Sequence, residues 1–107
     1  MSTEKRPLKE PPSIDDAAQA QELIRFWIAD NMDHVSLRVG EVTEPEKEPT
    51  MWGFILADIA KHVTDAFKEL HPDGPEKQQI IEEIVTGFLN RIQYGPKSPG
   101  QPTKMGD

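Results

Sequence analysis

Apolar and polar residues alternate from Leu23 to Gly40, and this alternation predicts a single β-hairpin. The segment is LIRFWIADNMDHVSLRVG, in which β-branched and aromatic residues flank an Asn/Asp-rich turn. We expect no other strand in the chain. A lone two-stranded hairpin is marginal in water, and both of its edges carry unpaired backbone groups. The hairpin therefore has to be covered by helices on one face and joined to another chain at an edge.

A hairpin loop with an even number of residues matches the apolar positions of the two strands best. A loop centred on Asn31 and Met32 places apolar residues opposite one another on one face. The expected pairs are Ile28 with Val35, Phe26 with Leu37, and Ile24 with Val39. This apolar face is the expected floor beneath the helices.

Two helices are predicted after an acidic, proline-bearing connector at Glu41–Pro49. Apolar residues at spacings of three and four predict one helix over Met51–His71, with Thr50 as its N-cap, and another from Pro75 to about Gln93. Asp73 and Glu76 resemble a capping box for the second helix. The short link favours an antiparallel pair. The order ββαα predicts an α+β fold in which the hairpin joins a second chain's hairpin in a four-stranded sheet.

The two ends of the 107-residue chain are too polar and proline-rich to join this fold. We expect a flexible N-terminal tail over residues 1–21, one ββαα domain over residues 22–94, and a flexible C-terminal tail over residues 95–107. A folded region of this size has a small core, and the chain has no cysteine with which to form a disulfide.

Charge and composition narrow the setting of the protein. The chain has 19 acidic and 12 basic residues, a net charge of -7, which disfavours general nucleic-acid binding. No stretch is apolar enough to span a bilayer, and no secretion signal is evident, so we expect a cytoplasmic protein without membrane contact. The absence of cysteine fits a reducing compartment.

The second face of the hairpin carries the candidate interface residues Arg25, Trp27, His34 and Arg38. In the expected register Arg25 lies opposite Arg38, a like-charge pair that needs an anion or a carboxylate between its members. We favour a face covered by the N-terminal segment or by a second subunit. A site for an anionic ligand or an acidic peptide is the alternative, and the net charge argues against a single-stranded nucleic-acid platform.

Asp58, His62 and Asp65 lie close together on one face of the first predicted helix. A carboxylate four residues before a histidine is able to share a metal ion or orient the imidazole. One helix supplies few ligands, however, and no second motif supplies more, so we favour a solvated, ion-paired face. The sequence shows no catalytic residue and predicts no cofactor.

Four segments resemble small bacterial proteins that are grouped only as a domain of unknown function. They are Phe26–Asp30, His34–Leu37, Trp52–Gly53 and Leu56–His62, so the resemblance covers roughly residues 22–70. It implies a compact bacterial ββαα protein with no established activity, and it carries over no catalytic residue. The long connector Glu41–Pro49 departs from the family pattern.

We interpret the chain as a non-enzymatic, homodimeric interaction or regulatory module. The first strand is apolar on both faces, whereas one pair of helices covers only one of them. Two alternatives remain open. One is a small metal-binding protein or enzyme that uses Asp58, His62 and Asp65. The other binds an anionic ligand or an acidic partner at Arg25, Trp27 and Arg38.

Overall fold

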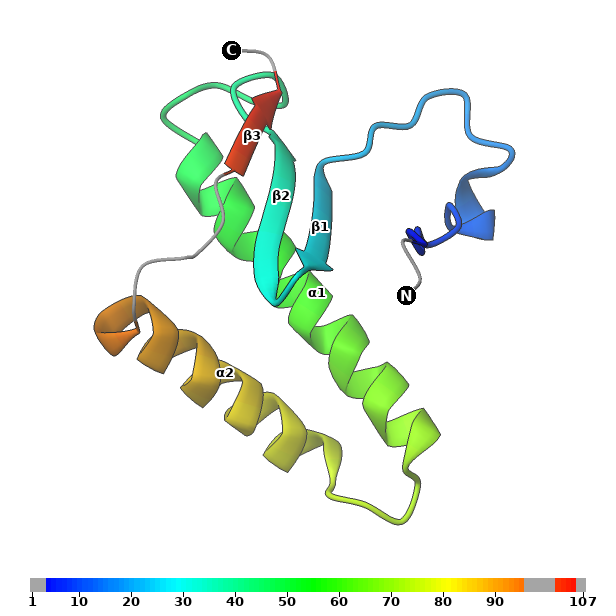
Figure 1. Ribbon diagram of the computed structural model, residues 1–107, viewed down its shortest axis with the longest axis vertical. Helices are drawn as coiled ribbons and strands as arrows, with labels where there is room; N and C mark the ends of the chain where they lie inside the picture. The colour runs from blue at the N-terminus through cyan, green and yellow to red at the C-terminus, as the bar shows by residue number, and fades with distance from the viewer. Residues whose placement is uncertain (1–3, 96–101, 106–107) are drawn as a thin grey trace.

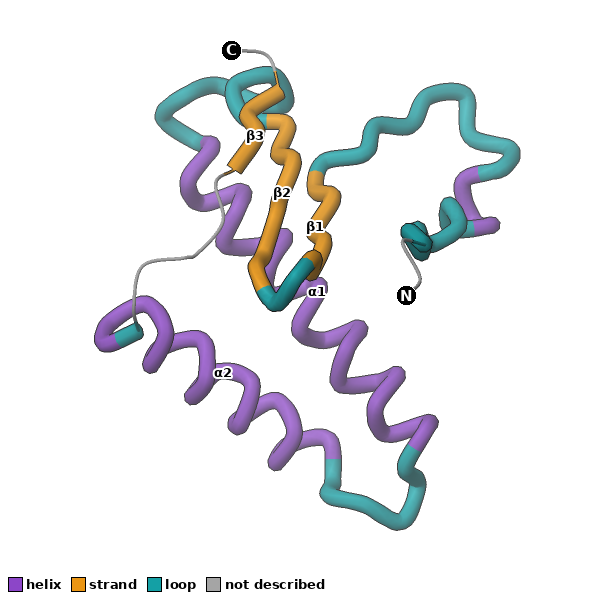
Figure 2. The backbone as a smooth tube through the Cα atoms, in the orientation of Figure 1, coloured by secondary structure: helices purple, strands orange, loops and turns teal. Residues whose placement is uncertain are grey.

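The computed structural model describes residues 4–95 and 102–105, and it contains a hairpin followed by two helices (Figures 1 and 2). The sequence prediction of a ββαα order is therefore confirmed. The elements are a short 3-10 helix η1 (Pro12–Ile14), strands β1 (Ile24–Ala29) and β2 (Met32–Arg38), helices α1 (Glu48–Leu70) and α2 (Lys77–Tyr94), and strand β3 (Pro102–Met105).

The hairpin turns at Asp30 and Asn31, one residue earlier than expected. Both residues have positive φ angles, of 52° and 64°. Aspartate and asparagine tolerate this left-handed backbone, whereas the predicted loop centre would have required it of Met32. Ile28 therefore lies opposite Asp33, and Phe26 lies opposite Val35. The predicted register was wrong, but each side chain keeps its predicted face because the shift moves every partner by two positions.

A third strand joins the hairpin at the edge of β2. Strand β3 pairs with β2 in parallel, giving the sheet order β1-β2-β3. The expectation of no further strand was wrong for residues 102–105, which had been assigned to a tail. Residues 4–22 are exposed throughout and include η1. The other parts of the expected tails, residues 1–3, 96–101 and 106–107, lie outside the described residues.

Helix α1 begins at Glu48, before the predicted N-cap at Thr50. Pro49 fits in the first turn, where a backbone N–H has no helical partner to lose. The Glu48 side chain is buried, and its two carboxylate oxygens each accept the Gly40 N–H at 3.1 Å. One of them also accepts the Trp52 indole N–H at 2.8 Å. This carboxylate ties the end of the hairpin to the start of α1.

A lysine, rather than the predicted capping box, organises the link between the helices. Helix α2 begins after Glu76 with no side-chain cap, so the pairing of Asp73 with Glu76 was wrong. Instead, the Lys68 ammonium donates to the carbonyl oxygens of Pro72 at 3.0 Å, Gly74 at 3.3 Å and Pro75 at 3.2 Å. These carbonyls are left without helical partners by the two prolines and the turn, so the cation replaces the missing hydrogen bonds.

The two helices touch near their link and diverge away from it (Figure 1). Exposure along α2 rises accordingly, from 7% at Ile80 to 66% at Ile92. Ile80 is the one buried apolar side chain among residues 4–95. Phe26 and Ile28, expected beneath the helices, are 59% and 66% exposed, so that prediction was wrong for these two residues. Within the described part of the chain, neither helix has the length and hydropathy needed to cross a membrane.

Candidate interaction surface

The second face of the hairpin carries all four predicted interface residues. Trp27 lies directly opposite His34, and Arg25 lies opposite Ser36. Arg38 is paired with Leu23 instead, since its backbone N–H donates to the Leu23 carbonyl at 3.0 Å. The predicted Arg25–Arg38 pair was therefore wrong, as a direct consequence of the shifted register.

Each arginine already has a carboxylate partner within the chain. Arg25 donates from Nε and Nη2 to the two carboxylate oxygens of Glu22, at 3.1 Å and 3.0 Å. Arg38 donates to the Glu22 carbonyl at 3.2 Å and to the Glu41 carboxylate at 3.5 Å. Glu22, Ser36 and the two arginines line part of a shallow hollow of about 170 Å³. Glu22 supplies the carboxylate for Arg25 and Glu41 supplies the one for Arg38, so both guanidinium groups have an acidic partner within the chain.

The predicted metal stripe on α1 is not assembled into a metal site. Asp58, His62 and Asp65 are all exposed, and the Asp65 carboxylate pairs with the Lys77 ammonium on α2 at 3.0 Å. No group of three or more histidine, aspartate or glutamate side chains within the described ranges is placed to hold a metal ion. The three side chains lie on an exposed, charged face of α1, and its described ion pair joins Asp65 to Lys77.

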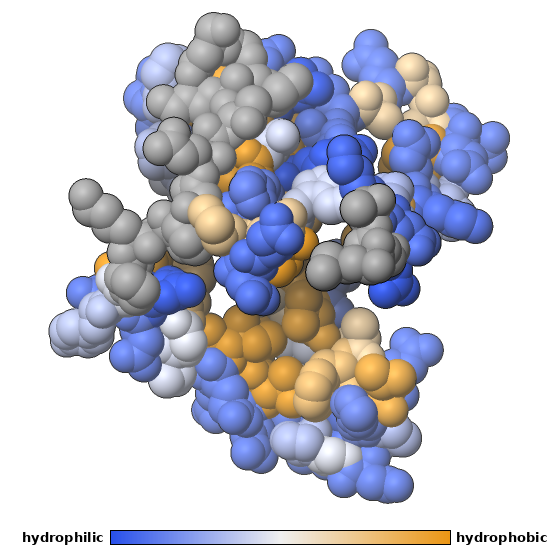
Figure 3. All heavy atoms as spheres, in the orientation of Figure 1, coloured by the Kyte–Doolittle hydropathy of each residue, from blue (hydrophilic) through white to orange (hydrophobic). Residues whose placement is uncertain are grey.

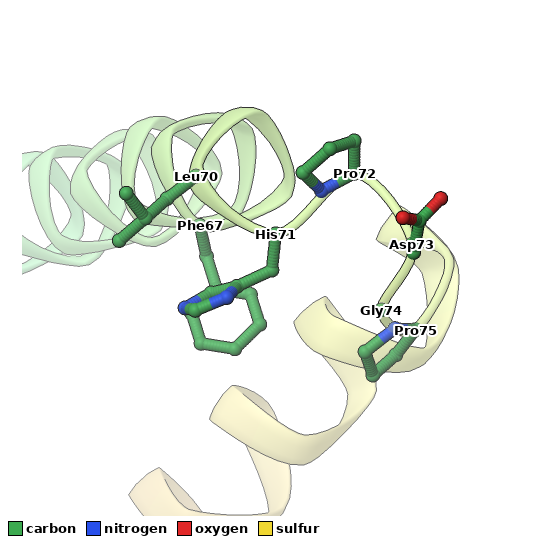
Figure 4. Close-up of a pocket in the computed structure, with 7 residues that line it drawn as sticks. All are labelled: Phe67, Leu70, His71, Pro72, Asp73, Gly74 and Pro75. Carbon is green, nitrogen blue, oxygen red and sulfur yellow. The ribbon is translucent and has the colours of Figure 1, made fainter.

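A larger hollow, of about 460 Å³, lies at the link between the helices (Figure 4). The His71 ring packs on the Phe67 ring, with centroids 4.8 Å apart, while the Asp73 carboxylate points away from both rings. Histidine and aspartate are therefore not oriented toward one another. The hollow shows an aromatic contact and a proline-rich wall, and no acid–base pair.

The broadest unexplained surface belongs to the helices. Figure 3 shows apolar residues gathered between α1 and α2, where the two helices diverge. We call this the helical apolar surface. Its members are between 42% and 74% exposed: Leu56, Ile59, Val63, Phe67 and Leu70 of α1, and Val85, Phe88, Leu89 and Ile92 of α2. The spacing of apolar residues at three and four positions predicted an apolar face on each helix, but it gave no sign that one chain leaves these faces open.

The size of the chain's surface agrees with this exposure. The chain exposes 9505 Å², whereas a compact monomer of 12.1 kDa exposes about 6,000 Å². Its radius of gyration is 16.2 Å, whereas about 13 Å is typical of a compact domain of this length. The extended segment at residues 4–22 adds to both values. It does not account for nine half-exposed apolar side chains on the helices.

Comparison with known proteins places the chain in a family without assigning a chemistry. The family model "Domain of unknown function (DUF5076)" matches residues 7–95. No curated protein matches. A similar solved structure is that of a "putative pyruvate dehydrogenase from the photosynthetic bacterium Rhodopseudomonas palustrus CGA009", with a TM-score of 0.63 and 22% identity. The match covers 94% of this chain and 95% of that one, so the two share a fold over nearly their whole length.

Proposed function

The chain belongs to the DUF5076 family of domains of unknown function, and we propose that it is a non-enzymatic, homodimeric interaction or regulatory module. The observation that carries this proposal is the helical apolar surface. A second copy covers it and supplies the burial that a single chain lacks. The proposal places the module in the cytoplasm. The chain has no cysteine, so its fold does not depend on disulfides and is compatible with a reducing compartment.

The exposed apolar side chains on the helices offer area for a dimer interface. The chain exposes roughly 3,500 Å² more than a compact monomer of its mass, and the extended residues 4–22 account for part of this excess. A standard interface takes about 800 Å² from each partner, and obligate homodimers take about 1,000–2,500 Å² from each. Obligate interfaces are also more apolar than the remaining surface, which agrees with the residues that line the helices here.

Neither alternative activity gains support from the arrangement of side chains. An acidic ligand at Arg25 and Arg38 would have to displace the Glu22 and Glu41 carboxylates that already contact them. The name of the Rhodopseudomonas palustrus protein is not transferred, because a likeness at 22% identity carries the fold and no chemistry.

Size-exclusion chromatography with light scattering tests the proposal on the full chain. We expect twice the chain mass of 12.1 kDa at micromolar concentration. Phe88→Asp places a charge in the helical apolar surface, so it should shift the protein toward monomer. A wild-type chain that is monomeric at this concentration would refute the proposal.

Phe54→Asp provides the matched control. Phe54 is 68% exposed, more than the 48% of Phe88, but it lies on the far side of α1 from the apolar arc, at about 100° of rotation per residue. The same charge at this position should leave the dimer intact. Equal dissociation of both variants would show that the helical apolar surface has no special role.

A further inference from the structure

Strand β1 forms an open edge of the sheet in the described part of the chain. The sheet order is β1-β2-β3, so β1 pairs on one side only. The Arg38 N–H donates to the Leu23 carbonyl, and this bond shows which residues of β1 direct their backbone groups toward β2. In an antiparallel pair the backbone groups of alternate residues point toward the partner strand. Those of Leu23, Arg25, Trp27 and Ala29 therefore face β2, and those of Ile24, Phe26 and Ile28 face outward.

This edge lacks the features that usually prevent strand addition. Over Ile24–Ala29 there is no proline and no lysine, and Arg25 is the single charged residue. Phe26 and Ile28, whose backbone groups point outward, also have side chains that are 59% and 66% exposed. The opposite edge is different, because β3 already occupies the outer side of β2. Apolar side chains and free backbone groups thus coincide at β1.

We infer that β1 pairs with β1 of a second copy, antiparallel, about a two-fold axis beside Phe26. This inference rests on the proposed homodimer and adds a second contact between the same two chains, at the edge of the sheet. In this register Phe26 lies opposite the second Phe26, and Ile24 lies opposite Ile28 in both directions. All of the outward-facing groups then pair, in about six backbone hydrogen bonds. The six apolar side chains share one face of the joined sheet, because each even-numbered residue of one β1 lies opposite an even-numbered residue of the other.

The opposite face gains a matching contact between the chains. The same register places Arg25 of one chain opposite Trp27 of the other, in the pairing type that brings side chains closest. Glu22 binds the guanidinium through its edge, at Nε and Nη2, which leaves the planar face free. Arginine stacks on an indole through that face. Trp27 would then lie between His34 of its own chain and Arg25 of the second copy.

The joined sheet has the strand order β3-β2-β1-β1-β2-β3. The exposed apolar edge at β1 is then covered in both chains, because each β1 pairs with the other. The residues of the second hairpin face then have two kinds of partner. Arg25 and Trp27 are interface residues, whereas Arg38 stays within its own chain, held by Glu22 and Glu41.

Disulfide trapping tests this register, since the natural chain contains no cysteine. Residues directly opposite in such a pair have Cα atoms about 5.5 Å apart, within the range of about 4.4–6.8 Å that a disulfide spans. Oxidation of Phe26→Cys should link two copies. A mixture of Ile24→Cys and affinity-tagged Ile28→Cys should give the mixed species rather than either self-linked one.

His34→Cys is the control, because His34 is exposed on β2 and in the inferred dimer would lie about 16 Å from its copy, three strand spacings across the sheet and two residues along it. It should not link. If the wild-type chain is dimeric by light scattering and the Phe26→Cys variant, itself a dimer, gives no link, the inferred register is wrong and the homodimer stands. Linking of His34→Cys as fast as Phe26→Cys would also overturn the register. A monomeric wild-type chain would remove both proposals.

Discussion

Replacement of Glu48 by alanine should destabilise the fold more than any other change to a single carboxylate near the hairpin. The Glu48 side chain is 8% exposed and accepts hydrogen bonds from two donors, the Gly40 N–H and the Trp52 indole N–H. Hydrogen bonds to a charged group contribute about 1.5–3 kcal/mol each. Gly40 is itself exposed, so its N–H regains water when the carboxylate is lost. We therefore expect a loss of about 2–4 kcal/mol.

The assay is urea unfolding at a fixed protein concentration, because a dimer's stability depends on concentration. Tryptophan fluorescence follows the transition. The loss should appear as a lower midpoint with an unchanged slope, which reports the surface exposed on unfolding. A decrease of about 2–4 kcal/mol is a large share of the 5–15 kcal/mol typical of a domain.

Two further variants separate the carboxylate from general effects of charge. Glu46→Ala removes an exposed carboxylate nearby and should change the stability by no more than about 0.5 kcal/mol. Glu48→Gln keeps one acceptor oxygen and should cost less than Glu48→Ala. If Glu48→Ala costs no more than Glu46→Ala, the carboxylate does not tie the hairpin to α1 and the reasoning fails.

Two other predictions concern the turns. Asn31 has a φ of 64°, so Asn31→Gly should raise the stability by about 0.5 kcal/mol, whereas Asn31→Val should lower it by about 1–2 kcal/mol. Thermal unfolding distinguishes them, and a stabilising valine would contradict the left-handed turn. Lys68→Met removes the donor to three link carbonyls and should cost about 1–2 kcal/mol in urea unfolding. Lys61→Met, at an exposed position on the same helix, is the control, and an equal cost at both positions would argue against a role for the link.

The sequence by itself determined the elements and their order. Alternation predicted β1 and β2, and spacings of three and four predicted α1 and α2. Both signals depend on which residues lie next to one another along the chain, so they can be interpreted without knowledge of the fold. The faces of the hairpin were also correct, because side-chain direction depends only on parity along a strand.

The register was decided by the backbone of the turn. The pairing of Ile28 with Val35 satisfies the apolar pattern better than its actual pairing with Asp33. The left-handed conformations of Asp30 and Asn31 outweigh that gain. Shifts of two residues leave the pattern of faces unchanged, so hydrophobic periodicity alone is unable to exclude them.

The candidate surface also depended on tertiary structure. The spacing of Ile59, Val63 and Phe88 indicates an apolar face, but it is silent on what covers that face. Only the divergence of α1 from α2 shows that one chain leaves these side chains open. In the same way, the contacts of Glu22 with Arg25 and Arg38, and of Lys68 with the link, join groups that follow no periodic pattern. Local order is encoded in neighbouring residues, whereas burial depends on the distance between elements that only the folded chain sets.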